Sequence, residues 1–185
     1  MQLGNSKSRY GWAAIALHWI VAAGVIAMLW IGLSADQEGI SRAERGELMG
    51  LHFSVGFFVL LAVLIRTYWS LSQPKPEPLP QPKVLDVVSR VVHYALLAAV
   101  FLLVVSGPLA VWSGGRAISV FDLFAVPTPF AERNESVHEA AEVVHGIGRY
   151  MIYVALPLHL LGVIKHLVID RDRTLQRMLY VKSDA

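Results

Sequence analysis

The sequence predicts an all-α membrane protein: a four-transmembrane-helix bundle with both termini in the cytoplasm. Three observations lead to this prediction. Of the 185 residues, 55% are hydrophobic and only 16% are charged, whereas soluble domains carry about 25% charged residues. Four apolar stretches are long enough to cross a bilayer, which takes about 20 residues of helix. Lys and Arg residues are concentrated on one side of these stretches, which indicates that side as cytoplasmic.

The predicted spans cover residues 13–33, 48–69, 91–112 and 143–169, and residues 1–185 are interpreted as one membrane domain. Backbone groups in lipid must be hydrogen-bonded within the segment, so each span is predicted to be a helix. The first apolar run follows Lys7 and Arg9, as in a signal peptide. Its length exceeds the roughly 7–15 residues of a signal sequence, so we interpret it as a mature helix.

The connections between the spans differ in charge and in stiffness. Eleven basic residues lie on the predicted cytoplasmic side: Lys7, Arg9, Arg66, Lys75, Lys83, Arg90, Lys165, Arg171, Arg173, Arg177 and Lys182. The opposite side has four, Arg42, Arg45, Arg116 and Arg133, together with nine acidic residues. Between the second and third spans, every other residue from Pro74 to Pro82 is proline. Such a stretch favours extended polyproline II and acts as a stiff spacer.

Composition also excludes several classes of protein. The net charge of +2 is too small to indicate a nucleic-acid partner, and the apolar content excludes a disordered chain. The chain has no cysteine. This excludes iron–sulfur clusters, cysteine-type zinc sites and covalently attached c-type haem. Any bound metal must therefore be held by histidines or carboxylates.

Histidines within the spans are the candidate functional residues, since ionisable groups inside a membrane are rarely structural. His145 and His159 are 14 residues apart. On an α-helix this is about 21 Å and nearly four full turns, so both face the bundle interior at two depths. On the other spans, His18 lies at the same depth as His159, so these two residues are paired on the cytoplasmic side. The same matching pairs His52 with His145 on the outer side.

Two pairs of imidazoles stacked in a helix bundle suit two b haems, each held through its iron and by packing. Arg66 lies 14 residues after His52, on the same face, where the propionates of the inner haem would lie. Arg149, one turn after His145, is a candidate partner for a propionate of the outer haem. Gly56, one turn after His52, would leave room for a flat macrocycle. In the alternative interpretations, Arg66 only extends toward water and the glycine only allows close helix packing.

Two other uses of these histidines are disfavoured. A structural zinc ion needs four ligands at one point, whereas these histidines lie at two depths. A proton relay needs a continuous polar path with acidic groups, and within the spans Glu142 is present only at an edge. His138, taken alone, is interpreted as a hydrogen-bonded packing residue.

With these residues in place, the chain resembles the bacterial cytochrome b561 family of small di-haem inner-membrane cytochromes. The matching segments are residues 9–19, 50–56, 93–97, 145–150, 156–166 and 172–179, together with Arg66, Gly107 and Pro108. The resemblance implies two haem b groups, with iron ligation by His18, His52, His145 and His159. It also implies electron exchange with a quinone, expected to be ubiquinone, in the bacterial cytoplasmic (inner) membrane. Some members of the family are superoxide oxidases and others serve periplasmic redox partners.

The sequence therefore predicts a cytochrome that transfers electrons between the periplasmic side and the quinone pool. His93 and His166 lie near the inner haem and are candidates to hydrogen-bond or protonate a quinone. The first alternative is a superoxide:ubiquinone oxidoreductase, and a more remote one is a non-redox membrane transporter. The acidic outer loops oppose capture of the superoxide anion and suit a basic periplasmic redox protein. Whether the chain is an enzyme in its own right is left open.

Overall fold

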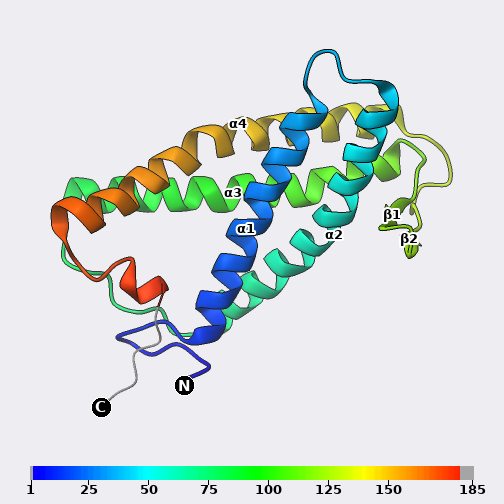
Figure 1. Cartoon of the computed structure of the whole chain (residues 1–185). Helices are drawn as coiled ribbons and strands as arrows, with labels where there is room; N and C mark the ends of the chain where they lie inside the picture. The colour runs from blue at the N-terminus through cyan, green and yellow to red at the C-terminus, as the bar shows by residue number, and fades with distance from the viewer. Residues whose placement is uncertain (1, 180–185) are drawn as a thin grey trace.

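The computed structural model describes residues 2–179 and consists mainly of four long helices (Figure 1). They are α1 (Trp12–Ala35), α2 (Arg42–Ser72), α3 (Lys83–Ser113) and α4 (Glu135–Lys165). Each contains a predicted span, and α4 continues into a π-helical turn at His166–Asp170. Lys182, one of the basic residues counted above, lies outside the described residues. Among residues 2–179, all four helices are long and apolar enough to cross a membrane.

Helices α2 and α4 begin earlier than their apolar stretches because polar residues cap them. At the start of α2, Ser41 Oγ accepts from Glu44 N at 3.2 Å, and Glu44 Oε2 accepts from Ser41 N at 2.9 Å. These two hydrogen bonds form a capping box, which satisfies two otherwise unpaired donors. At the start of α4, Asn134 Oδ1 accepts from Val137 N at 3.1 Å. The charged first turns therefore extend the helices beyond the hydrophobic core of the bilayer.

The bundle is built from two helix pairs. α1 packs along α2 and α3 packs along α4, whereas α2 and α3 touch over a small area (Figure 1). Glycines set the close approach within each pair: a Cβ at Gly24 of α1 would lie 2.7 Å from Val59 of α2. A Cβ at Gly148 of α4 would likewise lie 3.0 Å from Leu103 of α3. Small residues at such positions let helix backbones pack closely in a membrane.

Most of the helical surface is apolar and exposed. At most 17% of the residues in the most apolar window of each span are buried within the protein. Large apolar side chains such as Ile26, Leu64 and Val105 are each at least half exposed. In water this surface would be strongly unfavourable. The exposed helix faces are therefore the lipid-facing surface of a multi-pass membrane protein.

The two ends of the bundle differ, and both ends of the described chain lie at the same one (Figure 1). We call this the terminal end. There the Pro-rich connection is tied to both chain ends: Glu77 N donates to Lys7 O at 2.9 Å, and Arg177 donates to Glu77 O at 2.9 Å. Trp19 Nε1 also donates to Met178 O at 2.7 Å. Segments far apart in the sequence thus form one cap over this end.

The opposite end, called the hairpin end, carries a β-hairpin that the sequence did not predict. Strand β1 (Ile118–Val120) pairs antiparallel with β2 (Phe124–Val126), and Ile118 lies opposite Val126. The turn places Phe121 and Asp122 in the left-handed region, with φ of 49° and 56°. Three-residue strands are too short to produce a clear alternating pattern, so the sequence alone does not reveal this hairpin.

Candidate functional site

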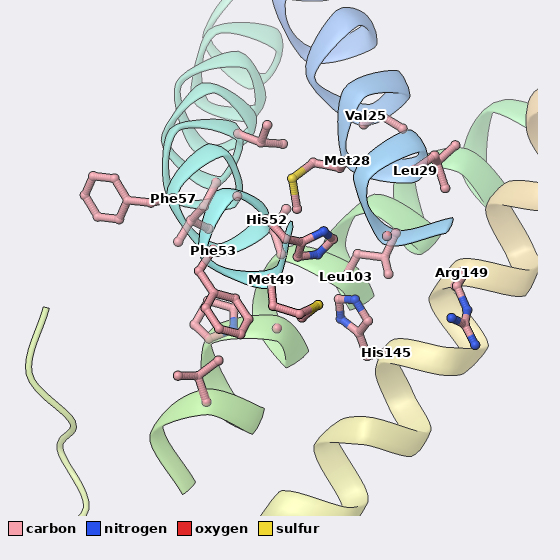
Figure 2. Close-up of a pocket in the computed structure, with 18 of the residues that line it drawn as sticks. Val25, Met28, Leu29, Met49, His52, Phe53, Phe57, Leu103, His145 and Arg149 are labelled. Atoms are coloured by element: carbon pink, nitrogen blue, oxygen red, sulfur yellow. The ribbon is translucent and has the colours of Figure 1, made fainter. Parts of the chain in front are cut away.

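The hairpin end contains a cavity of about 270 Å³ between the two helix pairs. His52 from α2 and His145 from α4 point toward one another across it (Figure 2), and their ring centres are 6.4 Å apart. The remaining lining is almost entirely apolar and includes Met28, Phe53 and Leu103. The structure therefore brings together the pair of histidines that depth matching assigned to the outer side.

Backbone space and hydrogen bonding orient these two rings. A Cβ at Gly32 of α1 would lie 3.6 Å from His52 Cε1, and one at Gly107 of α3 would lie 3.4 Å from His145 Cε1. Ser106 Oγ lies 3.1 Å from His145 Nδ1 and donates its own hydrogen to Leu102 O. Ser106 therefore accepts from His145 Nδ1–H, which leaves Nε2 of His145 as a free electron-pair donor.

Gly56 and Arg149 both line this cavity, but each also has a neighbour of its own. A Cβ at Gly56 would lie 3.1 Å from Met28 Cε, so the space beside this glycine is taken by a flexible thioether side chain. Arg149 Nη1 lies 2.5 Å from Asp36 Oδ2, at the end of α1. Sequence reasoning missed this ion pair, because it depends on how the end of α1 lies against α4.

A second cluster lies toward the terminal end and contains His18, His93 and His159. The rings of His93 and His159 touch edge to face, with centres 5.3 Å apart. His18 is close enough to both to interact electrostatically, and Arg66 acts on all three through its positive charge. The structure thus places Arg66 with the terminal-end histidines, as the 14-residue spacing predicted. It also places His93 directly against His159, a contact that depth matching did not indicate.

His166 lies beyond this cluster, on the π-helical turn at the end of α4. Its Nδ1 is 2.7 Å from Asp172 Oδ2 and 3.1 Å from Asp170 Oδ2. Lys165 Nζ also contacts Asp170 at 2.5 Å. The three donor atoms of His166, Asp170 and Asp172 lie within 4.8 Å of one another. Because Lys165 compensates Asp170, we interpret the group as an ion-pair network that fixes the His166 ring.

Asp172 is held as a carboxylate in this network. Desolvation acts to raise its pKa, but hydrogen bonds from the Thr174 side chain and backbone and from His166 outweigh it and lower the pKa. Thr174 N donates to Asp172 Oδ1 at 2.8 Å. A carboxylate can only accept, so His166 donates through Nδ1–H and its Nε2 is left as an acceptor. His138, by contrast, bonds to Ala110 O at 2.8 Å, in keeping with a packing role.

Two histidine clusters at two depths of a four-helix membrane bundle are an arrangement typical of redox proteins. Comparison with known proteins agrees with a redox role. Residues 9–180 match the family model for prokaryotic cytochrome b561. The chain belongs to the prokaryotic cytochrome b561 family. It is 31% identical over 180 residues to cytochrome b561 homolog 2 of Escherichia coli (strain K12), covering 97% of this chain and 95% of that relative.

A second relative is the probable superoxide oxidase CybB of Yersinia pestis. It is 26% identical over 174 residues, covering 92% of this chain and 96% of that protein. Both relatives thus match along nearly their whole length. Membership of the cytochrome b561 family identifies a multi-pass membrane protein of electron transport and implies b-type haem.

The residues of the hairpin-end cavity fit such a group. His52 Nδ1 is buried without a hydrogen-bond partner, as is His18 Nδ1 at the other cluster. Unpaired buried nitrogens are costly and rare unless a ligand completes the site. The apolar lining suits a flat, largely apolar macrocycle, and the two facing imidazoles suit its iron.

Proposed function

We propose that this protein is a di-haem b-type cytochrome that transfers electrons across the prokaryotic inner membrane, between its outer side and the quinone pool. His52 and His145 would hold one haem, and His18 and His159 the other. The observation that carries the proposal is the presence of one histidine cluster at each end of the bundle, with facing rings 6.4 Å apart at the hairpin end. The non-redox transporter is disfavoured by the family membership.

The orientation is part of the proposal. Most Lys and Arg residues outside the spans lie on the side of the terminal end, whereas nine of the fourteen acidic residues lie on the side of the hairpin end. The positive-inside rule assigns the basic end to the cytoplasm. The hairpin-end cluster then lies toward the periplasm, and the terminal-end cluster lies toward the cytoplasm.

Bound haem b supplies reversible one-electron chemistry at its iron. Each group would be held by two imidazoles, and at the hairpin end Val, Leu and Phe side chains would exclude water from it. Arg66 places a partly buried positive charge beside the terminal-end histidines, where it can face a propionate. Arg149 can pair with a propionate at the hairpin end only if it divides its hydrogen bonds between the propionate and Asp36, or gives up its ion pair with Asp36.

The quinone site is proposed at the terminal end, near His93 and His166. The Nδ1–H of His166 is engaged by Asp172, so Nε2 is the nitrogen that can exchange a proton with a quinone carbonyl. The ring of His93 contacts that of His159, which places His93 beside a proposed haem ligand. Ubiquinone is the proposed quinone, from the family resemblance.

Superoxide oxidation is the second candidate activity, supported by the similarity to the Yersinia relative. Capture of an anion is helped by a positive funnel. Here, however, the Arg149 charge beside the cavity is compensated by Asp36, and the hairpin-end loops are acidic. These charges favour a basic redox protein as the donor.

One experiment on the purified protein in quinone-containing vesicles tests the main proposal and separates the two donors. A reduced-minus-oxidised spectrum with b-type bands and two haems per chain is expected. Stopped-flow mixing with superoxide then shows whether the haems become reduced and whether quinol forms. Absence of b-type bands would refute the haem proposal. Haem reduction by a basic cytochrome but not by superoxide would support a partner-linked cytochrome.

A further inference from the structure

The β-hairpin folds back along α2 instead of projecting away from the bundle. Phe121 N donates to Ser54 Oγ at 2.9 Å, and the Phe121 ring is 6.2 Å from the ring of Phe58. Phe58 lies eleven residues beyond Glu47, the last charged residue before the apolar part of α2. This is about 16 Å along the helix axis. The hairpin tip therefore lies beside the apolar part of α2 (Figure 1). Because α2 is tilted, the depth of the tip in the membrane is smaller than this distance along the helix.

The tip presents large apolar side chains outward. Leu123 is 81% exposed, and Phe121 and Phe124 are each 48% exposed. Phe121 adjoins Phe58, itself 51% exposed on the lipid-facing side of α2, and Phe124 packs against the neighbouring Phe57. The hairpin tip and α2 thus form one continuous apolar surface. Such a surface exposed to water would be unfavourable and is typical of contact with a membrane.

Charge is nearly absent from the same segment. Between Arg116 and Glu132 there is a single charged residue, Asp122. Its Oδ1 accepts a hydrogen bond from Ser119 Oγ at 3.1 Å, which partly satisfies it within the turn. Charged residues at both ends of an apolar segment are the pattern expected for a segment that enters the bilayer and leaves it on the same side.

The buried side of the hairpin closes the cavity. Ile118 and Val126 line it, and Val120 is completely buried against Val111 of α3. Here α2 and α3 touch each other little, and β1 packs against both. The hairpin therefore stands between the cavity and the surrounding lipid.

We propose that the hairpin Ile118–Val126 is inserted into the lipid leaflet at the hairpin end, with Phe121, Leu123 and Phe124 in contact with acyl chains. Its backbone lies near the boundary between headgroups and acyl chains, where the unpaired edges of two short strands can still reach water. The occupant of this surface is lipid, and the hairpin serves as an apolar wall between lipid and cavity. This inference rests on the fold and does not depend on which electron donor is used.

The absence of cysteine in the chain allows a direct test with single nitroxide labels. Leu123→Cys reports on the hairpin tip in the full-length protein in phospholipid vesicles. Leu61→Cys, on the exposed apolar face of α2, is the matched lipid standard, and Glu132→Cys, on an exposed loop, is the aqueous standard. Collision rates with oxygen, which partitions into lipid, and with a water-soluble nickel chelate are measured for each label. An absorption spectrum like that of the unsubstituted protein confirms folding of each variant.

The ratio of oxygen to nickel collisions decides the outcome. A ratio at position 123 nearer to that at 61 than to that at 132 supports insertion of the tip. A ratio nearer to that at 132 overturns the proposal, since the tip would then project into water or contact a water-accessible protein partner. Adding a soluble redox partner provides a further check: for an inserted tip, the ratio at 123 stays unchanged.

Discussion

The two histidine clusters differ in the charge that surrounds them. At the hairpin end, His52 and His145 face an apolar cavity, and the nearby Arg149 is compensated by Asp36. At the terminal end, the partly buried Arg66 acts on His18, His93 and His159 together. A positive charge favours the reduced form of a haem, because reduction lowers the positive charge of the iron. We therefore expect the terminal-end haem to have the higher midpoint potential, so that electrons move from the hairpin end to the terminal end.

Removing one imidazole from the hairpin-end pair should have the largest effect. His52→Ala takes away a proposed iron ligand and should release one haem. Because each proposed haem is held by its own pair of histidines, the haem content should fall to about half. Haem per protein is measured from the pyridine complex. His138→Ala is the matched control, since His138 lies outside both clusters and contacts Ala110 O and the Glu142 carboxylate. Loss of both haems in His52→Ala would show that the two clusters are not independent sites.

The charge difference between the clusters is tested by Arg66→Leu. Removing this charge at roughly 10 Å should lower the terminal-end potential by 1–2 kcal/mol, on the order of 40–80 mV for one electron. A redox titration followed by absorbance measures both haems at once. Arg66→Lys keeps the charge and should stay close to the unsubstituted protein. Equal shifts of both haems in Arg66→Leu would contradict the assignment of Arg66 to one cluster.

A smaller shift is expected from Ser106→Ala. Accepting from His145 Nδ1–H makes the imidazole a stronger donor and favours the oxidised haem. Without that bond, worth about 0.5–1.5 kcal/mol, the hairpin-end potential should rise by roughly 20–60 mV. The terminal-end potential is the internal control. Ser113→Ala is a matched variant, because Ser113 Oγ bonds to backbone carbonyls of the same helix.

The smallest expected effect is a pH dependence confined to the terminal end. The lowered pKa of Asp172 means that its contribution to stability is fully present above its ordinary pKa of 3.8 and is lost as the pH falls through the lower folded-state value. A nitroxide at Gln176→Cys should therefore gain mobility only at strongly acidic pH. The same label in an Asp172→Asn background should show greater mobility at neutral pH and less change with acid. An unchanged acid response in that background would rule out Asp172 as its origin.

The parts of the fold that follow local rules were predictable from the sequence. Apolar stretches of sufficient length predicted the four helices, and the 14-residue spacings on α2 and α4 predicted which end Arg66 and His159 would share. The β-hairpin was not predictable, because its strands are three residues long and its stability comes from packing on Ser54 and Val111. The contact of His93 with His159 depends on how α3 is rotated against α4. Hydropathy and spacing contain no information on that rotation.

The cap over the terminal end also bears on how the chain is made. Met178 meets Trp19, which lies 159 positions earlier, and Arg177 meets Glu77, 100 positions earlier. These contacts can form only after all four helices have been synthesised, so they form last during biogenesis. We therefore expect Arg177 and Met178 to tie the two helix pairs together late in folding, after each pair has formed.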